Sequence, residues 1–387
     1  MTRFNFPLFF RLLHHSFFRS RNTPGRLCPR RWGFLLGTVL FAYPLVEIVH
    51  RVAWLLDEVF YRRYRQEAVE APVFIVAPHR SATTLLFETL ARDPQFSALK
   101  LWESALAPAV VERKAVWALL TLDRRIGAPL RRLLDMMGRR MASAPQAQAL
   151  YRAHRPRLTG VEEETMLFLH IAGSYDLLAF FPFVDALAEY ADYHRRVPEA
   201  RRRRDMAYYR SMIQRHHTAH PGRRHLAKVP TLAPAIPDVL SVFPDARFIH
   251  LVRHPYEVIP SAMTLWYGHW RMNGCPDHYR REARVIAEVY CLWYRRLHED
   301  LAHLPPQRYI RVHYRALTAD LGATVRRIYQ QLDLPLSAEM AAYLDEQTPR
   351  ARAYRPRNAY TLEQWGLRRE EIAEMCREVG KMYGFAL

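Results

Sequence analysis

The stretch Pro72-Val-Phe-Ile-Val-Ala-Pro-His-Arg-Ser-Ala-Thr-Thr84 decides the fold class of this chain. Its first half, residues 72–77, is a short apolar run, which is typical of a buried strand. Its second half is polar, and a helical pattern follows over residues 83–91. The stretch therefore predicts a strand, a loop and a helix, with the loop at the carboxyl end of the strand.

Similar apolar runs occur later in the chain. Residues 247–252 form one, and residues 225–228 and 309–312 are two further candidate strands. Helical patterns separate them, including residues 285–301 and 324–332. Strands that alternate with helices predict an α/β fold with a central parallel sheet flanked by helices. The polar, arginine-rich stretch 186–224 predicts a solvated helix face or a lid.

The 387 residues divide by character into two parts. Residues 1–70 are basic, apolar and helical in pattern, and we expect them to form an extension. Residues 71–387 carry the alternating strands and helices and are long enough to form one large domain.

An uncharged run of 15 residues, Trp32 to Val46, lies within the extension and follows a segment with seven arginines and no acidic residue. The run is shorter than the roughly 20 residues that a spanning helix needs, and Pro44 interrupts it. Three interpretations stay open: a helix packed on the protein's own core, an anchor in a membrane interface, and a true span with a cytoplasmic N-terminus. A signal peptide is not indicated, because no small-residue cleavage site follows.

The charge of the chain is strongly positive. There are 57 Lys and Arg residues against 38 Asp and Glu, which gives a net charge of +19. Such a charge indicates anionic partners, although a bias toward arginine codons would produce it as well. Only four residues are lysines, so most of the positive charge is arginine.

The four cysteines, Cys28, Cys275, Cys291 and Cys376, are far apart and form no CxxC pattern. This spacing argues against a disulfide framework and against a thiolate zinc site. It favours a reducing compartment, and hence a cytoplasmic protein.

The loop that follows the first strand has the residues that an anion needs. Backbone N–H groups and the helix dipole favour negative charge at such a strand–helix junction. Arg80 adds a fixed charge, and hydroxyl donors come from Ser81, Thr83 and Thr84. The glycine and lysine pattern of a Walker A loop is missing, which weakens the interpretation as a nucleotide kinase.

A second basic site follows the strand at 247–252. Arg253 ends that strand, and Ser261 lies eight residues later, about two helical turns on. The two side chains could converge on one phosphate.

Taken together, these blocks resemble the sulfotransferases that use 3′-phosphoadenosine 5′-phosphosulfate (PAPS), in the bacterial-type branch with PRSGTTLL, KxP and RDPxxVxxS blocks. In this chain the blocks are HRSATTLL, Ala227-Lys-Val-Pro230 and RHPYEVIPS. The resemblance extends from about residue 72 to the C-terminus. It implies a P-loop-like three-layer fold and transfer of a sulfuryl group from PAPS to a hydroxyl or an amine.

The resemblance also implies roles for single residues. The loop for the 5′-phosphosulfate corresponds to Arg80, Ser81, Ala82, Thr83 and Thr84. The pair for the 3′-phosphate corresponds to Arg253 and Ser261. Lys228 corresponds to the KxP lysine near the transferring group.

The chain departs from the family pattern at four positions. Alanine replaces the common glycine at Ala77 and Ala82, and Ala82 is expected to be the mildest change. His254 replaces Asp, and His79 replaces Pro. We expect His79 to face solvent rather than to add a donor to the loop.

Lys228 is informative even without the family. It is one of four lysines and lies in an apolar stretch at a predicted strand end. A compact ammonium suits an oxygen whose charge changes during transfer, although a snorkelling surface lysine would show the same pattern. With cationic side chains supplying charge, the reaction requires no metal, and none is expected.

An alcohol acceptor also needs a base, and two acidic sites compete for the role. Glu103 follows Trp102 shortly after the first helix, at a distance similar to that of the base in the related tyrosylprotein sulfotransferases. Glu163 and Glu164 lie in a block that looks like the acidic motif of the family. We rank Glu103 slightly ahead, and each could instead cap a helix or pair with an arginine.

A histidine motif, His216-His-Thr-Ala-His220, has the i,i+4 spacing of metal ligands but no glutamate within it. We therefore expect a polar turn there.

The main hypothesis is a PAPS-dependent sulfotransferase, cytoplasmic or peripheral on the cytoplasmic face of a membrane. Its acceptor would be a small-molecule or lipid-like hydroxyl compound. Rival hypotheses are a P-loop-type nucleotide kinase or NTPase, a basic nucleic-acid-binding protein, and a membrane-bound scaffold with an inactive transferase fold. Nucleic acid is not expected as a partner, because no known binding motif is present.

Overall fold

A computed structural model describes residues 4–129, 132–133, 136, 159–353 and 360–387 of the chain. Five parallel strands form the central sheet, in the order β2-β3-β1-β4-β5. They are β1 (Val73–Val76), β2 (Phe96–Ser97), β3 (Arg224–Lys228), β4 (Arg247–Val252) and β5 (Tyr309–His313). The four strands expected from the sequence are confirmed, and the two-residue strand β2 is an addition.

Strand β1 lies at the centre of the sheet. Val73 pairs with Leu226 of β3 and with Arg247 of β4. The loop that follows β1 therefore has the carboxyl ends of β3 and β4 on its two sides. This register brings Lys228, the last residue of β3, and Arg253, which follows β4, to the loop.

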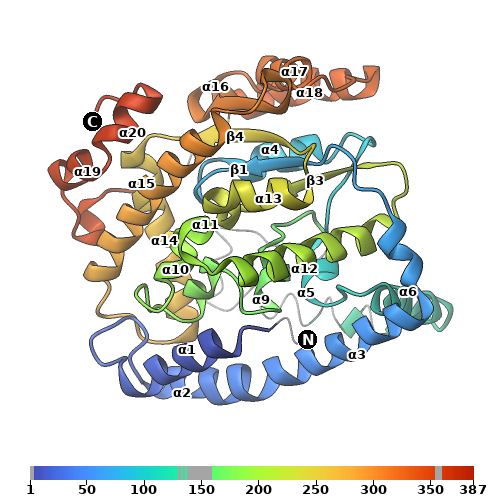
Figure 1. Cartoon of the computed structure of the whole chain (residues 1–387), viewed down its shortest axis with the longest axis horizontal. Coiled ribbons are helices and arrows are strands. Elements are labelled where there is room, and N and C mark those ends of the chain that lie inside the picture. Colours follow the sequence, from blue (N-terminus) through green and yellow to red (C-terminus); the bar gives the residue numbers. More distant parts are fainter. Residues whose placement is uncertain (1–3, 130–131, 134–135, 137–158, 354–359) are drawn as a thin grey trace.

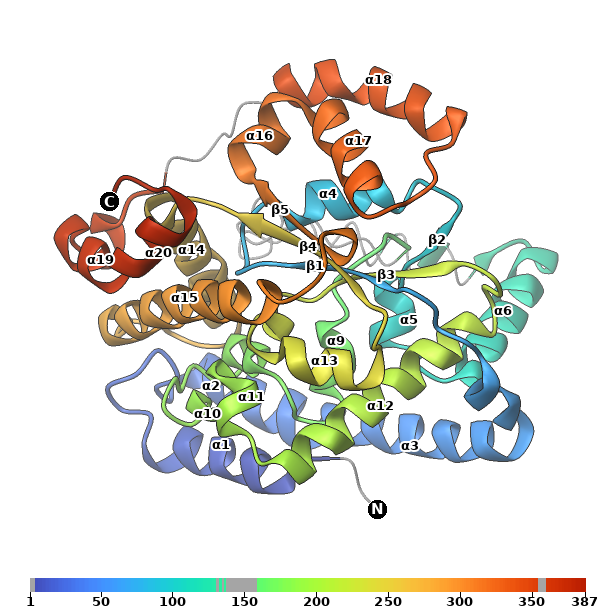
Figure 2. The same cartoon turned by 45° about the horizontal axis from the view of Figure 1, so that its top comes forward.

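Helices cover both faces of the sheet, as Figures 1 and 2 show. Alternate residues of β1 enter separate cores, with Val73 and Ile75 on one face and Phe74 and Val76 on the other. The first face packs against α4 (Thr83–Leu90), α16 (Tyr314–Ala319), α17 (Leu321–Gln331) and α18 (Ala338–Ala353). The second packs against α9 (Thr165–Leu169), α12 (Glu199–His217), α13 (Ile236–Val242), α14 (Pro255–Asn273) and α15 (Arg280–Leu301). The predicted α/β architecture of three layers is confirmed.

Further helices surround these elements. The α-helices are α5 (Leu101–Ala105), α6 (Val110–Arg125), α10 (Ala188–Ala191), α11 (Tyr193–Arg196), α19 (Arg369–Met375) and α20 (Arg377–Tyr383). The 3-10 helices are η2 (Arg62–Gln66), η3 (Tyr175–Ala179), η4 (Pro230–Ala235), η5 (Pro306–Arg308) and η6 (Glu363–Trp365).

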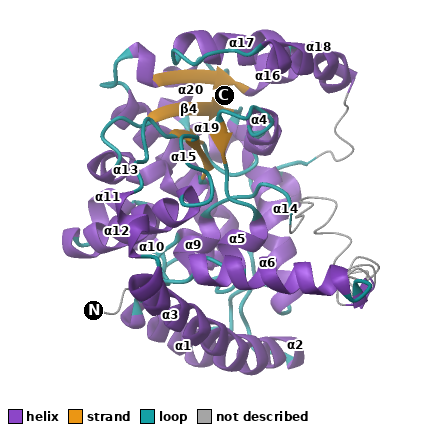
Figure 3. Cartoon of the chain, turned by 90° about the vertical axis from the view of Figure 1, so that its right-hand side faces the viewer, coloured by secondary structure: helices purple, strands orange, loops and turns teal. Residues whose placement is uncertain are grey.

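The N-terminal helices form a further layer beyond the second face, far from the sheet (Figure 3). They are α1 (Phe6–Phe18), α2 (Pro29–Gly33), the π-helix η1 (Phe34–Ala42) and α3 (Tyr43–Phe60). Part of this layer is joined to the main core, through the buried side chains of Leu8, Leu12, Leu35, Val39 and Trp54.

The last three of these elements form one continuous helix of 32 residues, Pro29–Phe60. The expectation that Pro44 interrupts the apolar run is therefore wrong. Proline removes a hydrogen-bond donor, and its ring would clash with the carbonyl four residues earlier. The wide turns of the π-helix end two residues before Pro44 and give the ring room, so the helix continues.

Helix α12 corrects the prediction for the polar stretch 186–224. Only its first half is polar and partly solvated, and there Arg201 pairs with Asp205 (2.8 Å) and Arg202 with Asp238 (3.1 Å). Most side chains of its second half are buried in the core. The sequence did not indicate that this half is buried, because it follows a run of arginines and its buried residues include tyrosines, histidines and a glutamine.

Two disulfide bonds correct the expectation drawn from cysteine spacing. Cys28 is bonded to Cys275, and Cys291 is bonded to Cys376. The first bond joins the N-terminal layer to the segment after α14, and the second joins α15 to the start of α20. The partners are 247 and 85 residues apart, so spacing along the chain could not pair them.

Candidate functional site

The loop after β1 has an unusual backbone at two positions. Arg80 has φ +72° and Ala82 has φ +66°, a conformation that glycine adopts most easily. Ala82 directly precedes α4, and the left-handed turn orients the first N–H groups of that helix. Alanine at position 82 is therefore not a mild departure from glycine, since an L-residue pays about 1–2 kcal/mol in this conformation.

Arg80, Arg253 and Ser261 lie together beside this loop. The Arg80 Nε donates a hydrogen bond to the Ser261 Oγ (3.2 Å), and an Arg253 Nη1 donates to the Arg80 carbonyl oxygen (2.8 Å). The Arg253 guanidinium also lies over the ring of Tyr314, 4.4 Å from its centroid. Two forked cations and a hydroxyl at one loop are suited to a phosphate or sulfate group.

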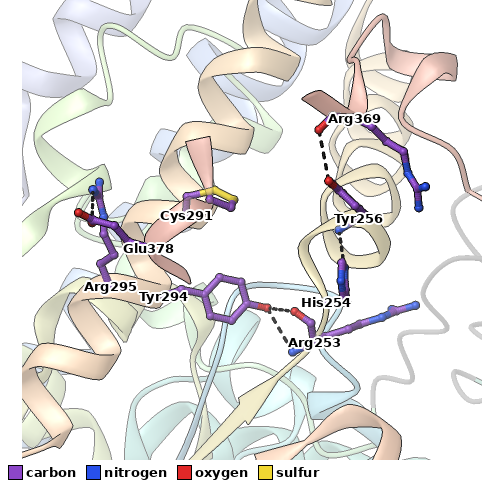
Figure 4. The surroundings of a disulfide bond; sticks show 9 residues. Arg253, His254, Tyr256, Cys291, Tyr294, Arg295, Arg369 and Glu378 are labelled. Atoms are coloured by element: carbon purple, nitrogen blue, oxygen red, sulfur yellow. Dashed lines mark hydrogen bonds and ion pairs between the residues drawn. A yellow bond between two sulfur atoms is a disulfide. The ribbon is translucent and has the colours of Figure 1, made fainter. Parts of the chain in front are cut away.

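The backbone of Arg253 is held from helix α15. The hydroxyl of Tyr294 donates to the Arg253 carbonyl oxygen (2.7 Å) and accepts from the Arg253 N–H (3.3 Å), as Figure 4 shows. Burial raises the pKa of Tyr294 to about 12, so the hydroxyl keeps its proton at neutral pH. Cys291 lies one turn earlier on the same helix, so its disulfide to Cys376 also fixes the helix that positions Arg253.

Lys228 lies at the end of β3 and is fully buried. Its Nζ donates to the Thr84 Oγ1 (3.0 Å) and lies 3.1 Å from the Glu163 Oε1 and 3.5 Å from the Glu162 Oε1. The snorkelling alternative is thus wrong, because this ammonium points into the site and not to solvent. A buried charge requires such partners.

Beside Glu163 the structure places a histidine–aspartate pair. The His79 Nε2 lies 3.1 Å from the Asp176 Oδ1, and one ligand atom from each of His79, Asp176 and Glu163 lies within 4.8 Å of the others. The expectation that His79 faces solvent is wrong, since its ring is buried against Trp266 and Trp293. Burial alone would lower the pKa of His79, but the Asp176 carboxylate, with help from Glu163, outweighs it and raises the pKa.

The two candidate bases are in different places. Glu163 contacts Lys228, whereas the Glu103 Oε2 accepts a hydrogen bond from the Lys100 N–H (2.8 Å) and caps α5. Glu103 also faces His216, with 3.9 Å between its Oε2 and the His216 Nδ1. No contact joins Glu103 to Lys228 in the part of the chain that the structure describes.

The expected polar turn at the histidine motif is wrong for its first two residues. His216 and His217 end helix α12 and are buried, and only the residues after them form a turn. Burial is the main cause that lowers the pKa of His216 far below its ordinary value. The helix continues further than a pattern rich in polar residues indicates.

Several residues of the site carried little signal in the sequence. Tyr294 and Tyr314 are aromatic residues within helical patterns, and Asp176 lies in a short 3-10 helix without a motif. Glu162 precedes Glu163 in the acidic block, so its neighbour pointed to it. The remaining three are found only from their contacts with residues far away in the chain.

Cationic and hydroxyl side chains thus gather around the N-terminus of α4, where an anion would fit. A model of the sulfotransferase family matches residues 72–338, and the chain belongs to that family. It is therefore a sulfotransferase, and members of the family use a sulfate donor such as PAPS.

Named relatives and solved structures agree with this assignment. The chain is 27% identical over 361 residues to an omega-hydroxy-beta-dihydromenaquinone-9 sulfotransferase, Stf3, of Mycobacterium bovis, covering 90% of this chain and 81% of the relative. The match to Stf3 of Mycobacterium tuberculosis has the same values. The fold is that of sulfotransferase STF1 from M. tuberculosis (TM-score 0.69, 19% identity, 97% and 92% of the two chains) and of STF9 from Mycobacterium avium (0.66, 20%, 87% and 82%).

Substituting Asp176→Asn is expected to lower the pKa of His79. The charge that opposes desolvation would be gone, while the buried ring would keep its surroundings. The folded-state pKa is raised in the natural protein, so the ion pair stabilises the fold below the ordinary histidine pKa. That contribution is lost as the pH rises through the folded-state pKa.

Titration by NMR of the histidine rings measures this change, with the His79 signal assigned from its loss in His79→Gln. Asp185→Asn is the matched control, because Asp185 pairs with Arg281 at the surface. An unchanged His79 pKa in Asp176→Asn would contradict the pairing.

Proposed function

We propose that the protein transfers a sulfuryl group from PAPS to a hydroxyl group of a lipid-like acceptor at a membrane surface. The single observation that supports the donor is the convergence of two cationic groups on one loop. Arg253, Arg80 and Ser261 lie on one side of this loop, and Lys228 contacts Thr84 of α4 on the other. PAPS carries phosphate groups at two positions, so it needs positive charge on both sides of this loop.

Each residue of the site then has a role. The N–H groups at the start of α4, with Ser81, Thr83 and Thr84, hold the 5′-phosphosulfate. Arg253 and Ser261 hold the 3′-phosphate, and Arg80 lies between the two phosphate positions. Lys228 neutralises the phosphate oxygen that leaves when the bond between this oxygen and sulfur breaks.

The acceptor hydroxyl attacks the sulfur in line with the leaving oxygen, and its proton passes to a base. We assign the base to Glu163, because it lies 3.1 Å from Lys228 while Glu103 caps another helix. His79 and Asp176 lie next to Glu163, with ligand atoms within 4.8 Å of its carboxylate. Lys228 exchanges its contact with Glu163 for the donor, which releases the carboxylate toward the acceptor. The sulfuryl step itself uses no metal in this proposal.

Binding of the desulfated product, 3′-phosphoadenosine 5′-phosphate (PAP), tests the donor site. Arg80→Ala and Arg253→Ala are each expected to weaken binding about 10- to 100-fold, since a hydrogen-bonded charge on an anion contributes about 1.5–3 kcal/mol. Calorimetry on the full-length protein measures this change. Arg203→Ala is the control, because Arg203 lies on an exposed helix face. Equal affinity in all variants would overturn the site, and Mg²⁺-dependent ATP turnover would favour the kinase hypothesis.

Lys228→Ala is expected to reduce kcat by about 10²- to 10³-fold, whereas the affinity for PAP is expected to change by less than about fivefold. The lysine acts on charge that develops during transfer, so its loss affects the chemical step. Transfer of radiolabelled sulfate from PAPS to a lipid extract measures this step. Lys381→Ala, at an exposed lysine, provides the control. A kcat unaffected by Lys228→Ala would exclude this role.

The long N-terminal helix supports a membrane surface as the place of action. One side of it is held to the domain by polar contacts, between Glu47 and His170 (2.6 Å) and between Asp57 and Arg215 (2.7 Å). The other side exposes large apolar side chains: Leu36, Phe41, Leu45, Ile48, Val49, Val52, Leu55, Val59 and Phe60. By length and composition this helix could cross a membrane, but because one side of it is held to the domain we propose that it lies in the interface.

Charge and shape around this helix agree with that position. Exposed arginines precede it (Arg19 and Arg21), lie in its first turn (Arg30) and follow it (Arg62, Arg63 and Arg65), where they would reach anionic headgroups. A cavity of about 750 Å³, lined largely by aromatic and aliphatic side chains, opens between α1 and α3. An apolar cavity on this face is suited to the hydrocarbon part of a lipid-like acceptor. The relative Stf3 is named for a menaquinone-derived compound with such a chain.

The cytoplasmic location remains a prediction from the sequence. The two disulfide bonds argue against it, because such bonds are rare in a reducing compartment.

Vesicle binding tests the membrane surface. The double substitution Phe41→Asn with Val59→Asn is expected to lower partition into vesicles of phosphatidylcholine and phosphatidylglycerol by at least about tenfold, because two exposed apolar anchors are lost. Flotation of the full-length protein measures the partition. Leu336→Asn is the control, because Leu336 is exposed in the segment between α17 and α18, which lie at the other end of the molecule from α3 (Figure 1). A full-length protein that leaves the vesicles unbound would refute the membrane proposal without affecting donor binding.

A further inference from the structure

Glu103, His216 and His220 form a cluster away from the loop that holds the donor. Glu103 comes from α5, His216 from the last turn of α12, and His220 from the turn that follows it. One ligand atom of each residue lies within 4.8 Å of those of the other two. The rings of His216 and His220 are 4.6 Å apart, as their spacing of four residues allows.

His216 is the least satisfied member of this cluster. Its side chain is fully buried, and neither ring nitrogen has a hydrogen-bond partner among the described residues. The Glu103 oxygen at 3.9 Å is beyond hydrogen-bond distance. A buried polar group without a hydrogen-bond partner destabilises the fold, so a ligand that bonds to this ring would remove that cost.

We propose that Glu103, His216 and His220 bind a divalent transition-metal ion of the Zn²⁺ type. Two imidazoles and one carboxylate are a common ligand set for such ions, with a fourth position open to water. Bonds of about 2.0–2.2 Å need ligand atoms about 3.3 Å apart, which side-chain shifts of about 1 Å achieve here. The motif lacks a glutamate in the sequence, but the fold supplies one from 113 residues earlier.

The surroundings leave the carboxylate oriented toward the histidines. The Lys100 N–H bonds the Glu103 Oε2 and fixes this side chain, as outer hydrogen bonds do in metal sites. Arg113, a buried cation nearby, donates its Nε to the Ala107 carbonyl oxygen (3.0 Å) and an Nη to the Pro108 carbonyl oxygen (3.4 Å). Its charge also acts on Glu103, and its Nη1 has no hydrogen-bond partner among the described residues.

A metal at this position would connect two parts of the active site. The segment before α5 pairs with the acidic block, since the Glu162 N–H donates to the Leu99 carbonyl oxygen (3.1 Å). His220 lies just before β3, the strand that ends at Lys228. By joining α5 to the end of α12, the ion would therefore help to keep β3, which carries Lys228, and the acidic block with Glu162 and Glu163 in their relative positions. It would also occupy Glu103, which leaves Glu163 as the base.

Zinc binding by the intact protein tests this site. The chain is treated with a chelator and titrated with Zn²⁺ or Co²⁺, and the bound metal is measured by mass spectrometry and by the visible absorption of Co²⁺. We expect one ion per chain, and we expect His216→Ala, His220→Ala and Glu103→Gln each to lower affinity by at least about tenfold. Glu103→Gln keeps an oxygen that can cap α5, and His220 is only partly buried, so these two variants are expected to fold.

His278→Ala is the control, because this histidine is exposed and outside the cluster. No bound ion, or binding that all three cluster variants retain, would overturn the proposal. Binding that only Glu103→Gln retains would exclude Glu103 and the three-ligand site. The measurement contains neither donor nor acceptor, so its outcome is independent of the proposed function.

Discussion

The buried ammonium of Lys228 is the constraint on which the rest of the site depends. It has no access to solvent, so its charge must be balanced inside the protein, and Glu162 and Glu163 provide the balance. This requirement joins β3, the start of α4 and the acidic block before α9 in one arrangement. The same arrangement places two carboxylates, a lysine and the N-terminus of α4 next to one another.

Polar contacts also determine how the N-terminal layer is oriented. In most amphipathic helices the apolar side faces the core. In the helix Pro29–Phe60 the inner side instead includes Glu47, His50 and Asp57, each paired with a residue of the domain. Breaking such a buried pair costs several kcal/mol, so the helix cannot easily roll over to bury its apolar side. The polar contacts of its inner side therefore keep the apolar surface of this helix exposed.

Much of the fold could be predicted from the sequence, because local periodicity carries it. The runs at β1, β3, β4 and β5 are short, apolar and followed by helical patterns. Strand β2 was missed, because two residues show no periodicity. The sequence singled out Arg80, Lys228, Arg253 and Ser261, and the structure brings them to one loop, while their roles stay a prediction. Solvent exposure was predicted less well, and His79 and His216 proved to be buried.

By itself, the sequence determined four of the five described strands, the loop at the end of β1 and the cations at the ends of β3 and β4. Register along parallel strands brings such ends together, so these inferences needed no coordinates. Only the tertiary structure decided which carboxylate faces Lys228, which cysteines pair and which glutamate joins the histidine motif. These choices depend on contacts between residues that are tens to hundreds of positions apart. Such contacts follow from the packing of whole elements, and no local pattern of residues records them.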